Sequence, residues 1–142
     1  MLVAEILKDK GSAVFTIPPG LSLAEACVEL ERLRVGALMV CQNDRVVGVL
    51  SERDVVRAVA RYGEAGLARP VSDFMTADVV FAGPAESMAM LMARMTDRRI
   101  RHLPVLVDDR LAGVISIGDV VKYQIAEATH EAESLRTYIA AG

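Results

Sequence analysis

The sequence predicts a mixed α/β (α+β) fold built from two β-α-β-β-α repeats that pack on each other with pseudo-twofold symmetry. When the chain is compared with itself at a shift of 65 residues, 15 of the 44 positions from 14 to 57 are identical. Both copies end on nearly the same nine residues, GVLSERDVV at 48–56 and GVISIGDVV at 113–121. An ungapped self-match of this length indicates an internal duplication.

The elements of each repeat follow from apolar periodicity. A short apolar run, at 13–17 and again at 79–82, predicts a short strand before a proline-containing turn. An amphipathic helix follows, because apolar residues recur with i, i+3, i+4, i+7 spacing at Leu23, Ala26, Cys27 and Leu30, and at Met88, Leu91, Met92 and Met95. Two strands around a polar turn come next, and a second helix starts in the shared nine-residue stretch. Because neither half can cover both faces of its sheet, we expect the halves to pack together.

The repeat defines the domain organisation. We predict a first repeat at 1–62, a linker at 63–70, a second repeat at 71–126 and a helical tail at 127–142. Apolar residues continue into the tail at alternating spacings of four and three, which is typical of a helix with one apolar seam (Val121, Ile125, Ala128, Ala132, Leu135 and Ile139). We expect this seam to pack on the repeats or on a second copy of the chain.

Composition excludes several classes of function. The 142 residues are 53% apolar, with a net charge of −3 and 4% aromatic residues, so nothing favours nucleic-acid binding. No apolar run is long enough to span a membrane, and the N-terminus lacks the features of a signal peptide. Cys27 and Cys41 form no CxxC pair and no zinc-type spacing. We therefore expect a cytoplasmic protein without a metal or catalytic cofactor.

The Ser-x-x-Asp stretches, Ser51 to Asp54 and Ser116 to Asp119, support two interpretations. Ser with an acid three residues later resembles a capping box at the start of a helix. The same helix N-terminus offers free N–H groups to a phosphate, and the carboxylate can accept hydrogen bonds from a ribose diol. The glycine before each motif, and Gly118 within the second, suggest a close approach to the backbone. The sequence leaves both interpretations open.

Taken together, the chain resembles a tandem pair of CBS domains, the cystathionine-β-synthase type of module, forming one Bateman module. The Gly-h-h-Ser-x-x-Asp stretch, where h is apolar, matches the nucleotide-contacting motif of that family in both repeats, and RHLPV at 101–105 matches its second-repeat strand. The resemblance covers roughly residues 3 to 126. As a whole, the chain is similar to stand-alone bacterial signal-transduction proteins of this family.

The resemblance implies adenine-nucleotide ligands (AMP, ADP, ATP or NAD(H)) in clefts between the repeats. It implies that Asp54 and Asp119 hold ribose hydroxyls, and that Ser51 and Ser116 lie near ribose or phosphate. It further implies an adenine pocket lined by the first short strands and the middle strands (Thr16, Ile17, Phe81, Ala82, Ala37, Leu38, Met39, His102, Leu103 and Pro104).

A basic cluster, DRRIRH, precedes the second middle strand. Arg101 and His102 stand where the first repeat has Gly36 and Ala37, so the two clefts are expected to be unequal. Arg99 and Arg101, with Arg53 or Arg57 from the first repeat, are candidates to hold phosphate, because guanidinium groups donate several hydrogen bonds to it. A solvated basic edge, or pairing with nearby acids, is the alternative.

These observations favour a non-catalytic sensor that binds adenine nucleotides and signals by conformational or oligomeric change, as a homodimer or through an unknown effector protein. A structural dimerisation module with empty clefts is the alternative. An enzyme is disfavoured, because the sequence shows no nucleophile–base pair and no metal ligand set.

Overall fold

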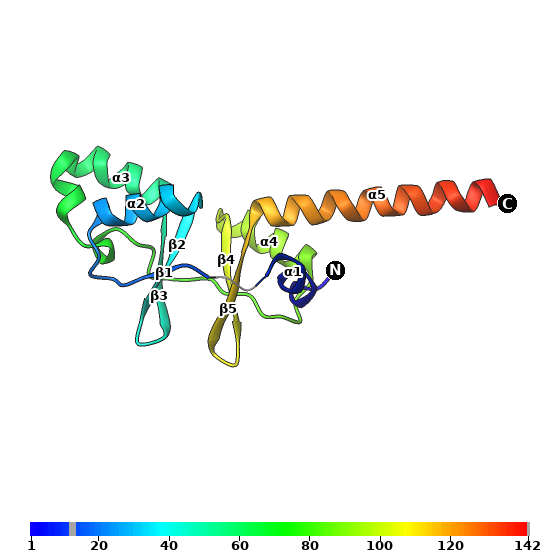
Figure 1. Ribbon diagram of the computed structural model, residues 1–142, viewed down its shortest axis with the longest axis horizontal. Coiled ribbons are helices and arrows are strands. Elements are labelled where there is room, and N and C mark those ends of the chain that lie inside the picture. The colour runs from blue at the N-terminus through cyan, green and yellow to red at the C-terminus, as the bar shows by residue number, and fades with distance from the viewer. Residues whose placement is uncertain (12–13, 142) are drawn as a thin grey trace.

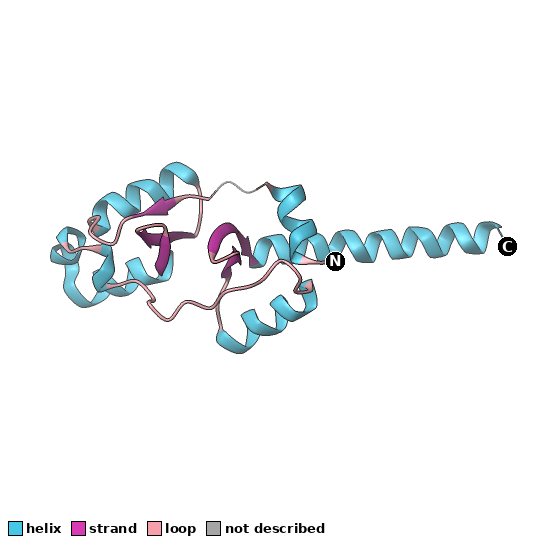
Figure 2. Ribbon diagram, turned by 90° about the horizontal axis from the view of Figure 1, so that it is seen from below, coloured by secondary structure: helices cyan, strands magenta, loops and turns pink. Residues whose placement is uncertain are grey.

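The computed structural model describes residues 1–11 and 14–141, and it forms two similar halves that lie side by side (Figures 1 and 2). The first half contains β1 (Thr16–Ile17), α2 (Leu23–Leu33), β2 (Ala37–Gln42), β3 (Arg45–Ser51) and α3 (Glu52–Tyr62). The second contains α4 (Met88–Arg98), β4 (His102–Val107), β5 (Arg110–Ser116) and α5 (Ile117–Ala141). The predicted mixed α/β fold of two repeats with a C-terminal helix is confirmed. Ala13, which begins the predicted first strand, and Gly142, which ends the predicted tail, lie outside the described residues.

The two hairpins use the same turn. Asn43 and Asp44 both have positive φ, at 53° and 63°, and Asp108 and Asp109 repeat this at 52° and 61°. Two consecutive residues with positive φ are typical of a type I′ turn, whose twist matches that of the flanking strands. The register of β2 with β3 and of β4 with β5 is therefore the same, including a bulge at Val40/Cys41 and at Val105/Leu106.

The short first strand differs between the halves. In the first half β1 pairs in parallel with β2, but the corresponding run at 79–82 forms only an isolated bridge between Ala82 and Val105. The Ala82 N–H donates to the Pro104 carbonyl at 2.9 Å, and the Leu106 N–H donates to the Ala82 carbonyl at 3.0 Å. The next bond of this ladder, toward Val80, would need an N–H on Pro104, which proline lacks. The prediction of a second β1-like strand is wrong for this reason.

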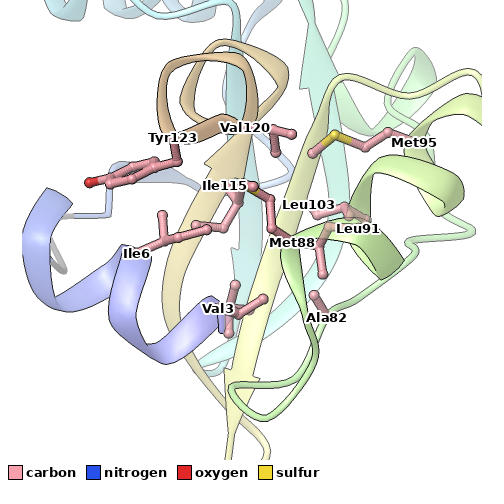
Figure 3. Close-up of a cluster of buried hydrophobic side chains, with 11 residues drawn as sticks. Val3, Ile6, Ala82, Met88, Leu91, Met95, Leu103, Ile115, Val120 and Tyr123 are labelled. Atoms are coloured by element: carbon pink, nitrogen blue, oxygen red, sulfur yellow. The ribbon is translucent and has the colours of Figure 1, made fainter. Parts of the chain in front are cut away.

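The leading segment of each half, meaning the stretch of chain that precedes it in sequence, packs into the core of the other half. The helix α1 (Val3–Lys10) packs into the core of the second half, where Val3 and Ile6 lie against Ile115 and its neighbours (Figure 3). Conversely, Val71 in η2 (Val71–Asp73) is fully buried in the core of the first half. The leading segments are thus exchanged between the halves.

The glycines that precede the Ser-x-x-Asp motifs make room for this exchange. A Cβ on Gly113 would lie 2.5 Å from Leu7 Cδ2, and one on Gly48 would lie 2.4 Å from Met75 Sδ. The close approach that the sequence suggested at these positions is therefore made by the chain itself.

The chain between the halves is structured. The segment predicted as a linker forms the 3-10 helix η1 (Gly63–Ala68), in which Gly66 is buried against α3. The helix α5 extends far beyond both halves (Figure 1), and its last buried residue is Tyr123. Within the part of the chain that the structure describes, neither of the two repeats packs on the apolar seam of this helix. Among the described residues, no helix is both long and apolar enough to cross a membrane.

Candidate ligand-binding site

Both Ser-x-x-Asp motifs form capping boxes. Ser51 Oγ accepts from the Asp54 N–H at 3.2 Å, and Asp54 Oδ2 accepts from the Ser51 N–H at 2.9 Å. At α5, Ser116 and Asp119 repeat these bonds at 3.2 and 2.8 Å, and the Ser116 hydroxyl also donates to Asp119 Oδ2 at 2.9 Å. The capping interpretation is confirmed. It leaves ribose binding open, because a carboxylate has several lone pairs and Oδ1 of each aspartate makes none of these bonds.

The second carboxylate has a partner that the sequence gave no reason to expect. Lys10, at the end of α1, donates from Nζ to Asp119 Oδ2 at 2.5 Å and to the Val114 carbonyl at 2.6 Å. Burial raises the pKa of Asp119, but the hydrogen bonds from Lys10 and Ser116 outweigh it and leave that pKa below its ordinary value. No ion pair is found for Asp54 within the described residues. The two motif carboxylates are therefore electrostatically different.

His102 lies at the boundary between the halves. A Cβ on Gly36, in the first half, would be 3.4 Å from His102 Cε1, and Glu52 lies beside the same position. Burial lowers the pKa of His102, as do the charges of Lys10 and Arg101, while Glu52 and Asp119 act in the opposite direction. The neutral imidazole is therefore favoured where the two halves meet.

Three arginines predicted to hold phosphate line one shallow pocket of about 400 Å³. Arg53 comes from the first turn of α3, whereas Arg99 and Arg101 come from the loop between α4 and β4. Ile117, the first residue of α5, lies in the same pocket, together with Met95, Thr96 and Ile100. The pocket therefore joins the two halves next to the N-termini of α3 and α5, where backbone N–H groups favour an anion. Arg57, one turn along α3, does not line it.

Arg99 occupies a backbone conformation that normally favours glycine. It has φ 53° and ψ 45° at the C-cap of α4, and Arg34 has φ 53° and ψ 47° at the equivalent cap of α2. A helix commonly ends on glycine in this left-handed region. An arginine here carries a conformational cost. Arg99 also lines the pocket.

The residues predicted to line an adenine pocket divide between the faces of the sheets. Four of them belong to the two cores and offer a ligand no surface (Ile17, Leu38, Ala82 and Leu103). Met39 and Pro104 are also buried, but side-chain alternation places them on the opposite faces of β2 and β4. Ala37, Phe81 and His102 are half-buried, and Thr16 is exposed.

Gly118 is not required by packing, because a Cβ there would meet only Ser116 Oγ, at 3.6 Å.

A larger hollow of about 810 Å³ lies over the outer face of α4, lined by Val80 and by α4 residues that include Arg94. It contains none of the predicted site residues. Arg94 in this hollow is already paired with Glu86, from Nη1 to Oε2 at 3.0 Å. The smaller pocket, with its three arginines, is therefore the better candidate for a phosphate site.

Comparison with known proteins identifies the family. A profile of the CBS domain matches residues 3–61 and 71–126. This chain is a CBS-domain protein. The mitochondrial CBS domain-containing protein CBSX3 of Arabidopsis thaliana is 30% identical over 149 residues, which cover 99% of this chain and 72% of CBSX3.

Solved CBS-domain structures share the fold. The CBS-domain containing protein ATU1752 from Agrobacterium tumefaciens superposes with a TM-score of 0.84 at 44% identity, covering 87% of this chain and 92% of that one. The CBS domain protein PAE2072 from Pyrobaculum aerophilum, solved in complex with AMP, has a TM-score of 0.74 at 27% identity, covering 84% and 89%. The tandem CBS pair predicted from the repeat is confirmed.

Proposed function

We propose that this CBS-domain protein is a regulatory module that binds an adenine nucleotide between its two repeats. The observation that carries the proposal is the pocket in which Arg53 from one repeat meets Arg99 and Arg101 from the other. A phosphate held there would contact both repeats at once. Its binding would therefore favour one relative placement of the repeats over others, which is the requirement for a ligand-driven population shift. A partner protein or a second copy would read that shift.

The pocket suits phosphate better than a cationic ligand. Three arginine residues line it beside two helix N-termini, and their positive charges favour an anion. AMP, ADP, ATP and NAD(H) all bring negative charge to such a site. S-adenosylmethionine carries a positive sulfonium and is disfavoured there. The AMP complex of PAE2072 supports an adenine nucleotide as the ligand class.

We propose that the base and ribose lie between the repeats. The residues that face away from the two cores would cover the base, namely Met39, Pro104, Ala37, His102, Phe81 and Thr16. Asp54 and Asp119 would accept from ribose hydroxyls through the oxygens that the caps leave free. Lys10 partly neutralises the second carboxylate, so its free oxygen is a weaker hydrogen-bond acceptor for ribose than that of Asp54. We therefore propose that the Asp54 side binds nucleotide more tightly.

Isothermal titration calorimetry on ligand-free protein tests the proposal. The panel is AMP, ADP, ATP, NAD, NADH and S-adenosylmethionine, each titrated into the wild type, Arg53→Gln and Arg57→Gln. Both arginines lie on α3, but only Arg53 lines the pocket, so only Arg53→Gln should weaken binding. Loss of one charged contact predicts a roughly tenfold or greater rise in Kd. No heat with any nucleotide would favour the structural dimerisation module, with the motifs acting as caps alone. Chemical turnover of a nucleotide would instead point to an enzyme.

A further inference from the structure

The second half of α5 packs against no other described part of the chain. Every described residue from Gln124 onward is exposed, and the helix projects clear of both repeats (Figures 1 and 2). The exposed segment is about five turns long. Most of the stability of a helix in a protein comes from packing an apolar face and not from intrinsic helix propensity. A surface that buries α5 is therefore expected.

The apolar face of α5 is a continuous seam, defined by Val121, Ile125, Ala128, Ala132, Leu135 and Ile139. Its large members are all uncovered, with exposed fractions of 50% for Val121, 61% for Ile125, 59% for Leu135 and 68% for Ile139. Spacings of four and three alternate along it, as in the a and d positions of a coiled coil. Isoleucine stands at the outer a positions and leucine at the last d position, a pattern that favours a coiled coil of two helices.

The α5 seam points away from the protein's own body. Val120 and Tyr123 bury the first turns of α5 in the core of the second half, and Glu127 pairs with the N-terminal amine of Met1 at 3.3 Å. At 100° per residue, these three positions lie about 130° around the helix axis from the seam. A second helix can therefore lie along the seam without meeting the CBS repeats.

The charges beside the seam select the orientation of that helix. Glu131 lies at a g position and Arg136 at the following e position of the heptad. In a parallel, in-register pair, Glu131 of each chain faces Arg136 of the other, so two attractive pairs form. In an antiparallel pair with the seam fully aligned, Arg136 faces Lys122 and Glu131 faces Glu131, so like charges meet.

We propose that two copies of this chain associate through the α5 seam as a parallel, in-register helix pair. Both CBS modules then lie at the same end of the pair, on its outer sides. The seam spans fewer than three heptads, so the association is reversible and depends on protein concentration. It requires no nucleotide, and its test is independent of the proposed ligand.

Sedimentation equilibrium of the full chain without nucleotide tests the orientation. Arg136→Glu should weaken the dimer about tenfold, because two attractive pairs become repulsive. The charge-swapped double variant Glu131→Arg, Arg136→Glu should restore wild-type affinity. In an antiparallel pair Arg136→Glu would instead face Lys122 and strengthen the dimer. A stronger dimer, no change, or a wild type that is monomeric at millimolar concentration would overturn the proposal.

Disulfide trapping gives a second readout. In a background with Cys27→Ala and Cys41→Ala, Ile139→Cys should cross-link to itself in a glutathione buffer, since a parallel register places position 139 beside its own copy. Thr137→Cys, on the outer face two residues away, is the matched control and should remain reduced. Equal trapping of both variants, or trapping of neither, would refute the parallel register. Unchanged helical circular dichroism would show that each variant is folded.

Discussion

Replacing Arg99 with glycine separates the cost of its backbone conformation from the use of its side chain. Arg99 caps α4 with φ 53°. A residue with a Cβ pays about 1–2 kcal/mol in this left-handed region. Glycine avoids that cost but loses about 0.5–1 kcal/mol more through conformational entropy on folding. Arg99→Gly should therefore leave the free energy of unfolding unchanged, or raise it by up to about 1.5 kcal/mol.

The same substitution should weaken nucleotide binding. If the Arg99 guanidinium donates to phosphate, its removal costs about 1.5–3 kcal/mol of binding free energy. That range corresponds to a rise in Kd of about 10- to 150-fold. Arg34→Gly is the matched control, because Arg34 has the same φ at the equivalent cap and does not line the pocket. It should change stability in the same direction and leave binding unchanged.

Urea denaturation measures the first effect and calorimetric titration with AMP measures the second. The account of Arg99 would be refuted if both glycine variants bound AMP as tightly as the wild type. It would also be refuted if Arg34→Gly weakened binding as much as Arg99→Gly. A loss of stability above about 1 kcal/mol in either variant would contradict the backbone argument alone.

Four further substitutions test the packing and charges around the site. Lys10→Met should lower the free energy of unfolding by about 1 kcal/mol and the Tm by about 3 °C, because it leaves the half-buried Asp119 carboxylate without its cation. Gly48→Ala should destabilise by about 2–3 kcal/mol and Gly113→Ala by about 1 kcal/mol, because only the first methyl also meets a backbone oxygen, at 3.1 Å. His102→Gln should reduce the loss of stability on acidification below pH 6.5, the ordinary pKa of histidine, because the buried native imidazole resists the proton that the unfolded chain accepts.

Each of these predictions has a control and a contradicting outcome. Lys8→Met, on the same helix, should leave Tm unchanged, and an equal drop in both lysine variants would argue against the Asp119 contact. Leu7→Ala should relieve part of the cost of Gly113→Ala in a double-mutant cycle, and strict additivity would contradict their contact. His130→Gln, which removes the histidine on the exposed part of α5, is the matched control for His102→Gln. If His102→Gln left the pH profile of stability unaltered, the native imidazole would not be held neutral.

Local signals in the sequence predicted much of the fold. Ser51 and Ser116 each begin a helix with an aspartate three residues later, so the capping boxes follow from chemistry within one turn. The repeat places the same hairpin before both motifs. The interrupted ladder at Ala82 could also have been predicted, because Pro104 in a central strand position removes a donor.

The site depends on contacts between distant parts of the chain, and these are not visible in a local pattern. Lys10 and Asp119 are 109 residues apart in sequence. They meet because α1, which precedes the first half in sequence, packs in the core of the second half. The same exchange explains Gly48 and Gly113, whose role in packing is not evident from the motif. The arginine cluster was recognisable, but the structure was needed to bring Arg53 to Arg99 and Arg101 and to exclude Arg57 from the pocket.

The most direct measurement is a crystal structure of this CBS-domain protein grown with AMP. We expect the phosphate within hydrogen-bonding distance of Arg53, Arg99 or Arg101, with the ribose hydroxyls on Asp54 or Asp119. The nucleotide would then contact both repeats. AMP on the outer face of α4, or bound to one repeat alone, would contradict the claim that the ligand acts by joining the two repeats.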